Sequence, residues 1–447
     1  MNAHQGALQR RKTHLHELLS TLDDLLRKSD PALGTHLKDI PETSLRGFFI
    51  DLRTLRAASL KLKMILTLIA KSYALWQESP AIRSLLACPG PYEELIRENP
   101  WKPEDTLIIQ TRIAPFIYKS YIQPSFKILD ISCNGLSGDI VFQGTKPGWD
   151  LALWRSLGFP TESFTYLDSL KFIADQISSL LASEASPSVA LMADMEDLTE
   201  LNQEKTVLFD YLAEYLTKTG IRAVLRDARE VTRGASFSLI VNTLPIEKLS
   251  ALRSSGSLEG FTSYWKAGRV INSGAHPVFS RGILELVTSP HYSQLLGTPP
   301  RETLTRMIPW TRILRDGKTI SPAGREVSLP EFVLEARNSL LIRPAFESPG
   351  ERIVAGAACT AGDWELHLKK AIEIPSGFVV QETIELPEAL LPVGRDGSLT
   401  WEKGEFWMEI SLNERADIGG ACAMTTLGEP SRLLPSSIVI PLLGDEQ

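Results

Sequence analysis

The chain has 447 residues, of which 43% are hydrophobic and 23% charged. These are the proportions of an ordinary globular protein, and they exclude a fibrous, collagen-like or disordered chain. The 47 basic and 54 acidic side chains leave a formal net charge of −7, so no overall positive field would attract nucleic acid or an anionic membrane. At about 150 residues per domain, the length predicts about three domains or lobes.

Targeting and redox signals are absent from the sequence pattern. Residues 1–11 are polar and no apolar stretch follows them, unlike a signal peptide, and no apolar run approaches the roughly 20 residues of a membrane span. The four cysteines are scattered, with no pair at the spacing of a metal or redox motif. We therefore expect a cytoplasmic protein with buried free thiols and with neither nucleic-acid nor membrane partners.

The first part of the chain has the periodicity of helices. Leucines recur every three or four residues between Thr13 and Leu26, and a second apolar stripe runs from Leu52 to Trp76. The lysines within this second stretch could form a phosphate-binding face, but a solvated helix surface is the commoner role, and we adopt it.

After residue 91 the pattern changes to short runs of β-branched and apolar residues, which predict strands at Thr106–Pro115 and Phe126–Ile131. The second predicted strand leads into the polar loop Ser132-Cys133-Asn134-Gly135. Polar side chains at the end of a buried strand are a frequent place for chemistry, although turn formation explains them equally well.

The middle of the chain predicts a parallel α/β unit. Ser188–Ala193 has the pattern of a buried strand, Glu204–Thr219 of an amphipathic helix, and Ile221–Leu225 and Ser238–Asn242 of further strands. Strand, helix and strand in this order favour parallel pairing. The glycine fingerprints of dinucleotide-binding and P-loop proteins are both missing.

The last third predicts a second mixed segment. A hinge or linker is predicted at Pro299-Pro300 and the polar stretch Asp316–Gly324, and a helix at Asp363–Ile372. We expect one sheet in this segment, made of the strands Leu340–Pro344, Arg352–Gly356, Gly377–Ile384, Phe406–Leu412 and Ser437–Leu443.

Between Leu341 and Glu382, five pieces follow one another in a recognisable order: Ile342-Arg343-Pro344, the loop Glu347–Ile353, Gly356, Trp364 and Val379-Val380-Gln381-Glu382. Together they resemble the ATP-binding lobe of circularly permuted ATP-grasp proteins similar to glutathionylspermidine synthase. That family has a strand with Lys-Pro, a mobile glycine-rich loop, a strand, a helix with Trp and a strand ending in Gln-Glu.

Pieces further upstream and downstream fit the same permuted order. They are Leu129–Asn134, Ser280-Arg281, Ile308–Arg312 and Gly419-Gly420. The resemblance therefore covers roughly residues 105 to 445.

The resemblance implies a fold and a domain organisation. The implied fold is a circularly permuted, ATP-grasp-like one of the α/β class, built from α+β lobes. It would be preceded by a helical N-terminal region. The expected divisions are a helical region at 1–100, a sheet segment with a metal-binding loop at 101–160, a preATP-grasp-like lobe at 161–315 and an ATP-binding lobe at 316–447.

The same resemblance implies residues that bind ATP. A pair of arginines would clamp the phosphates, a loop would cover them, and the Gln-Glu pair would meet adenine and ribose. The residues so assigned are Arg281, Arg343, Gly350, Arg352, Gln381 and Glu382.

A magnesium site and a substrate site are also implied. Asp130, Ser132 and Asn134 would supply hard oxygen ligands to Mg²⁺. Lys119 and Arg432 would be the catalytic residues. Lys119 lies where the family places an Arg and an Asp near the substrate carboxylate, and Arg432 would replace the family's Arg near Gly419-Gly420.

Several of the matching positions depart from the family pattern. Arg343 and Arg281 stand where the family has lysines, which replaces a compact ammonium by a planar fork. Pro349 lies in the glycine-rich loop, where it removes one N–H donor and fixes φ. Ser132 replaces the metal-binding Asn by a weaker hydroxyl ligand.

Three functional hypotheses follow. The first is an ATP- and magnesium-dependent carboxylate–amine ligase that acts on small molecules through an acyl phosphate. The second is a catalytically inactive homologue that binds nucleotide or a protein partner without turnover. The third is a helper protein whose N-terminal helices dock another subunit and whose pocket is vestigial.

Overall fold

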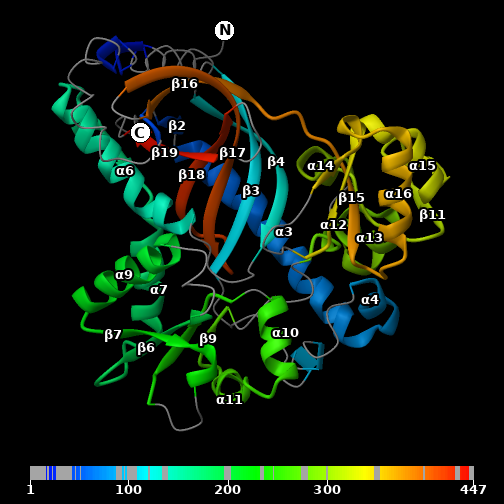
Figure 1. Ribbon diagram of the computed structural model, residues 1–447, viewed down its shortest axis with the longest axis horizontal. Coiled ribbons are helices and arrows are strands. Elements are labelled where there is room, and N and C mark those ends of the chain that lie inside the picture. The colour runs from blue at the N-terminus through cyan, green and yellow to red at the C-terminus, as the bar shows by residue number, and fades with distance from the viewer. Residues whose placement is uncertain are drawn as a thin grey trace.

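The computed structural model combines helices with several sheets, which confirms the predicted α/β class (Figure 1). Its described residues are 43–45, 47–50, 52–86, 108–118, 121–132, 139–195, 203–231, 236–244, 246–272, 280–297, 301–346, 353–395, 398–427 and 433–441, with a few isolated ones between 17 and 26 and between 93 and 97.

The largest sheet curves until its strands close on one another. Its path runs β1-β16-β17-β18-β19-β2-β4-β3, and β3 pairs in turn with β17. Strand β17 closes the ring because one of its edges pairs with β18, while the other pairs first with β16 and then with β3. We call this sheet the barrel. Its strands are β1 (Thr43–Ser44), β2 (Phe48–Ile50), β3 (Ile108–Tyr118), β4 (Tyr121–Ser132), β16 (Glu388–Arg395), β17 (Ser398–Asn413), β18 (Ile418–Leu427) and β19 (Leu433–Pro441), and β5 (Phe164–Tyr166) pairs with β19.

Apolar residues alternate along the barrel strands and turn one face of the sheet toward the main core. In β17 the buried positions Phe406, Met408, Ile410 and Leu412 follow this alternation, and the Phe406 ring stacks on Phe48 at 4.4 Å. The long helix α3 (Leu52–Glu78) adds its apolar stripe to the same core, as its period predicts. In Figure 1 it runs behind β3 and β4 toward α4 (Pro80–Leu85).

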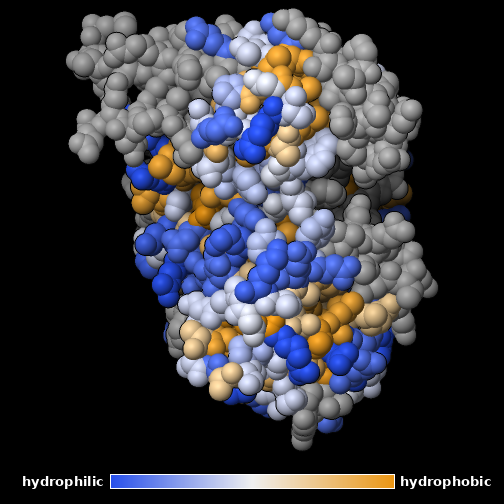
Figure 2. All heavy atoms as spheres, turned by 90° about the vertical axis from the view of Figure 1, so that its left-hand side faces the viewer, coloured by the Kyte–Doolittle hydropathy of each residue, from blue (hydrophilic) through white to orange (hydrophobic). Residues whose placement is uncertain are grey.

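Helices α6 (Asp139–Ser156) and α7 (Ser169–Leu180) cover the opposite face of β18. They approach it closely at Gly419 and Gly420. A Cβ built on Gly420 would lie 2.2 Å from Ser169 Oγ and 2.5 Å from Ser169 Cβ. The Gly419-Gly420 pair is therefore required by the packing of α7, whatever else it does. Figure 2 shows the side of the molecule on the left of Figure 1, where a hydrophilic band separates smaller apolar areas.

The second lobe is the predicted parallel unit. Its sheet has the order β7-β6-β8-β9, and β6 pairs in parallel with both β7 and β8. The prediction of strand, helix and strand is confirmed here. The elements are β6 (Ser188–Ala193), α9 (Gln203–Lys218), β7 (Arg222–Asp227), β8 (Leu239–Asn242), α10 (Ile246–Ser254), α11 (Glu259–Lys266) and β9 (Val270–Ile271).

The third lobe is built on a sheet of order β10-β15-β13-β14, which we call the small sheet. Helix α16 (Ala361–Ile372) packs Trp364 and Leu368 against one face of it. The elements of this lobe are α12 (Ile283–Thr288), α13 (Pro290–Leu296), α14 (Arg301–Met307), β10 (Thr311–Ile313), α15 (Leu329–Glu335), β13 (Leu340–Pro344), β14 (Val354–Ala355), α16 (Ala361–Ile372) and β15 (Phe378–Glu382).

Two expectations for this region are wrong. The stretch Asp316–Gly324 is not a linker, because β11 (Lys318–Ile320) and β12 (Glu326–Ser328) pair across it as an antiparallel hairpin. The predicted strands at Phe406–Leu412 and Ser437–Leu443 do form within β17 and β19, but they join the barrel and not the small sheet. Residues 316–447 therefore contribute to more than one sheet.

The N-terminal region is less uniformly helical than the spacing of its apolar residues predicts, because two strands interrupt it. Strand β1 pairs with β16, and β2 pairs with β19 and β4. Across the described ranges, no helix combines the length and the apolar character needed to cross a bilayer.

The glycine contact yields a stability prediction. Gly420→Ala should lower the free energy of unfolding by about 1–3 kcal/mol, because the new methyl group overlaps Ser169 and forces α7 away from β18. Thermal unfolding followed by circular dichroism measures the loss. Gly362→Ala in α16 is the matched control, since a Cβ there meets no atom within 4 Å. Equal melting midpoints for the two variants would contradict the packing account.

Candidate functional site

A buried carboxylate joins the barrel to the small sheet. Asp130 lies on β4, and its Oδ2 accepts hydrogen bonds from Arg281 Nε at 3.1 Å, Arg281 Nη2 at 2.8 Å and Arg343 Nη2 at 3.1 Å. The three residues are only 4%, 3% and 7% exposed. We call them the Asp130 triad. Two guanidinium groups and one carboxylate leave a formal charge of +1 in a nearly dry environment.

Strand alternation explains why Arg343 faces the barrel. On β13, Leu340 and Ile342 pack with α16, so the side chains between and after them point to the other face. Arg343 pairs with Val379 across β13–β15, and Thr311 pairs with Gln381 across β10–β15. By this register Arg343, Gln381 and Thr311 share the face of the small sheet that meets β4.

Arg281 is fixed by the end of the same strand. Its backbone N–H donates to the carbonyl of Ala345 at 2.7 Å, and its Nη1 donates to the carbonyl of Pro344 at 2.9 Å. Arg281 lies two residues before Ile283, the first residue of α12, so the segment that leads into this helix meets β13 and β4 at one carboxylate.

Gln381 lies in the same junction. It is 3% exposed, and its Nε2 is 3.1 Å from Thr311 Oγ1 and 3.5 Å from the carbonyl oxygen of Leu129 on β4. The next residue, Glu382, starts its side chain from the opposite face of the small sheet, because side chains alternate between the two faces along a strand. The Glu382 side chain is 38% exposed, and its Oε2 is 4.0 Å from Lys127 Nζ.

The sequence did not predict that residues of β4 other than Asp130 contact the small sheet. Lys127 and the Leu129 carbonyl both contact the small sheet. Arg312 belongs to the sequence piece Ile308–Arg312 but was assigned no role there. Arg312 is 1% exposed, lies over the Trp310 ring and donates to Thr319 Oγ1 at 2.9 Å. The alternation of β10, with Arg312 between Thr311 and Ile313, would have placed it on the face opposite Gln381.

A second ion-pair cluster lies at the carboxyl ends of β6 and β7. Asp194 Oδ1 accepts from Arg229 Nη1 at 3.1 Å, and Asp194 Oδ2 accepts from Lys248 Nζ at 3.0 Å. The Asp194 side chain is 2% exposed. No group of three or more His, Cys, Asp or Glu that could hold a metal ion occurs in the portion of the chain that the structure describes.

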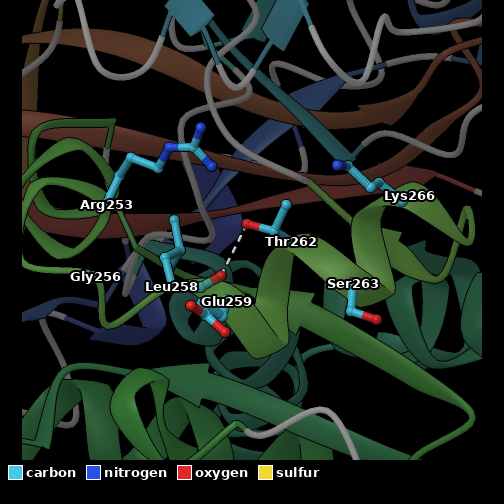
Figure 3. Close-up of a pocket in the computed structure, with 7 residues that line it drawn as sticks. All are labelled: Arg253, Gly256, Leu258, Glu259, Thr262, Ser263 and Lys266. Atoms are coloured by element: carbon cyan, nitrogen blue, oxygen red, sulfur yellow. Dashed lines mark hydrogen bonds between the residues drawn. The ribbon is translucent and has the colours of Figure 1, made fainter.

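A pocket of about 500 Å³ lies between the end of α10 and one side of α11. Arg253 and Lys266 extend toward the same side of it, while Thr262 Oγ1 donates to the carbonyl of Leu258 at 2.8 Å (Figure 3). None of the Asp130 triad lines it, and no residue singled out in the sequence does.

Several predicted site residues lie outside the described part of the chain. These are Lys119, Asn134, Gly350, Arg352 and Arg432. Ser132 is the last residue of β4, and its side chain also lies outside the description. The predicted residues that the structure brings together are therefore Asp130, Arg281, Arg343 and Gln381, with Glu382 at the rim.

Comparison with known proteins finds similarity of fold. A glutathione synthetase-like effector from Globodera pallida, in its apo form, superimposes with a TM-score of 0.53 at 10% identity, over 94% of this chain and 96% of that chain. A putative gamma-glutamylcysteine synthetase from Methylobacillus flagellatus KT covers 83% of this chain and 88% of its own at a TM-score of 0.38 and 9% identity. No family model and no curated protein matches the chain. The first similarity supports an ATP-grasp-like fold, and at this identity it concerns the fold alone.

The triad should dominate local stability. Asp130→Ala leaves two buried guanidinium groups without their carboxylate, so we expect the free energy of unfolding to fall by about 3–5 kcal/mol. Asp175→Ala is the control, because it breaks an exposed pair with Lys171 worth about 0–1 kcal/mol. Denaturant unfolding of both variants measures the difference. A loss below about 1 kcal/mol for Asp130→Ala would show that the triad does not hold the lobes together.

Proposed function

We propose that this protein is an ATP-grasp-like ligase that binds ATP with Mg²⁺ at the junction of β4 and the small sheet, and that it joins a small-molecule carboxylate to an amine through an acyl phosphate. The observation that carries the proposal is the convergence of the Arg281 and Arg343 guanidinium groups on one point. Guanidinium groups are the side chains best suited to grip phosphate oxygens in pairs.

The residues at the junction fit a magnesium nucleotide in charge and in donor type. Arg281 and Arg343 would hold the phosphates, Asp130 would offer a hard carboxylate ligand to Mg²⁺, and Gln381 would reach the base or the ribose. Bound ATP would supply the phosphoryl group that activates the carboxylate substrate. Ser132 and Asn134 remain the proposed additional metal ligands, and Gly350 and Arg352 the proposed cover of the phosphates.

Nucleotide binding at this junction would require the present contacts to rearrange. Both guanidinium groups now donate to Asp130, and Gln381 donates to Thr311 Oγ1. Binding therefore requires the arginines to exchange the carboxylate for phosphate oxygens, which shifts β13 and the start of α12 relative to β4. The order of the matching motifs, with the Asp130 strand preceding the small sheet, supports the proposed circular permutation and the likeness to glutathionylspermidine synthase.

A second candidate is a catalytically inactive homologue. The burial of the whole triad favours it, because Asp130 already forms a buried ion pair with Arg281 and with Arg343. In that case the junction would serve stability, and any remaining function would be binding without turnover.

Nucleotide binding is tested by thermal unfolding with and without ATP and Mg²⁺. Ligand at 100 times its dissociation constant should add about 2.7 kcal/mol of stability. Arg343→Ala should abolish this gain, since it removes half of the phosphate clamp. The control Arg325→Ala changes an exposed arginine of the β11–β12 hairpin and should keep the gain. Binding that persists unchanged in Arg343→Ala would reject the assignment of the clamp.

Turnover separates the ligase from the inactive homologue. We expect release of ADP and phosphate from ATP that depends on adding both a carboxylate and an amine, because the acyl phosphate forms on the first and is consumed by the second. A panel of amino acids, short peptides and polyamines measures this release. Nucleotide binding with no release across the panel would favour the inactive homologue.

A further inference from the structure

We propose that the exposed face of α3 is a docking surface for an acidic, amphipathic helix of a partner protein. The proposal concerns the N-terminal part of the chain and does not depend on the nucleotide site. A solvated surface is the commoner role for lysines on such a helix, but the charge and the exposed leucines of this face set it apart. The face, which we call the α3 stripe, consists of Arg53, Arg56, Leu60, Lys63, Thr67 and Lys71.

Helical spacing places these six side chains on one side of α3. Successive members of the stripe are three or four residues apart, so they lie one above another along the helix, and all six are exposed. Buried apolar residues form the opposite side of α3 and hold the helix against the main core. From Arg53 to Lys71 the stripe extends about 27 Å, at about 1.5 Å per residue. It is therefore a preorganised surface, which does not have to be ordered when a partner binds.

The charge of the stripe is the first observation. Helix α3 has five basic side chains and one acidic side chain, Glu78 at its end, although the whole chain has a formal net charge of −7. Four of the basic side chains belong to the stripe. Within the described ranges, Arg53, Arg56 and Lys63 form no ion pair. A surface of this charge is complementary to carboxylates on a partner.

Exposed leucines are the second observation. Among the described residues, Leu60 and Leu295 are the most exposed large apolar side chains, at 70% and 61%. Leu60 lies in the middle of the stripe. Leu295, on α13, lies next to the end of the stripe, because Lys71 Nζ donates to the carbonyl of the following residue, Leu296, at 3.2 Å. Exposed apolar side chains beside cations fit a partner whose apolar anchors are bordered by acidic residues.

The two observations together favour a protein helix over other polyanions. A nucleic acid would be repelled by the net charge of −7, and it has no apolar side chains to cover the leucines. An anionic membrane would bind α3 strongly only if the apolar side of the helix could insert, and that side is buried in the main core. An acidic helix with large apolar side chains among its carboxylates matches both the cations and the leucines.

The experiment uses a synthetic helical peptide of about 20 residues, which is long enough to cover the stripe. One face of the peptide carries glutamates with two leucines among them, and a second peptide has glutamine in place of every glutamate. Fluorescence anisotropy measures the binding of each labelled peptide to the full chain. The acidic peptide should bind at least about 10-fold more tightly than the glutamine peptide. It should lose this advantage at about 1 M salt, where the screening length is about 3 Å.

Variants of the stripe and matched variants on α16 locate the binding. Lys63→Glu should weaken binding of the acidic peptide at least about 10-fold, because like charges then face one another. Leu60→Ser should weaken it by about 10-fold, because an apolar anchor is lost. On α16, Lys370→Glu makes the same change of charge and Leu366→Ser removes an exposed leucine, and neither should change the affinity. Circular dichroism checks that each variant is folded.

Each contrary outcome overturns a stated part of the proposal. No binding of the acidic peptide by the folded wild-type protein at low salt would overturn the docking surface. Equal affinities of the wild-type protein and Lys63→Glu would place the peptide elsewhere and overturn the role of the stripe.

Other occupants give different results. Tighter binding of a single-stranded oligonucleotide, or of vesicles that contain phosphatidylserine, would overturn the protein partner if it is lost in Lys63→Glu and kept in Leu60→Ser. Self-association of the wild-type protein in light scattering, lost in both of these variants, would overturn a separate partner protein in favour of a second copy of this chain.

Discussion

The structure depends on three charges that meet where water is nearly excluded. Burying a guanidinium or carboxylate group is costly unless it is paired and hydrogen-bonded, and in this structure Asp130, Arg281 and Arg343 pair with one another. They come from β4, from the segment just before α12 and from β13. Together with the apolar core that Ile313 and Val379 of the small sheet share with the barrel strands, this pairing joins the small sheet to the barrel.

The same requirement ties stability to function. In the proposed function, the phosphate clamp uses the same two guanidinium groups that pair with Asp130 in this structure. The formal charge of +1 and the exchange of one anion for another provide a physical route between the two roles. They also show why an inactive homologue would keep the arrangement, since the arginines cannot lose their partner without cost to the fold.

Local patterns predicted much of the fold. The buried run Ser188–Ala193 is β6, and the helix with Trp364 and the strand ending in Gln381-Glu382 form where expected. The hairpin across Asp316–Gly324 was missed because its three-residue strands are too short to show a period. The partners of β17 and β19 depend on pairing with β3 and β2, some 300 to 390 residues away, which no local pattern encodes. In the site, sequence reasoning grouped Arg281 with Arg343. It assigned Asp130 to a metal and not to these arginines, since contacts across 151 and 213 residues are fixed only by the assembled sheets.

The most direct measurement is a crystal structure with a non-hydrolysable ATP analogue and Mg²⁺. The account predicts that the Arg281 and Arg343 guanidinium groups bind phosphate oxygens, that the Asp130 carboxylate lies against the metal ion, and that β13 has moved away from β4. A nucleotide bound elsewhere on the protein, with both arginines still donating to Asp130, would contradict it.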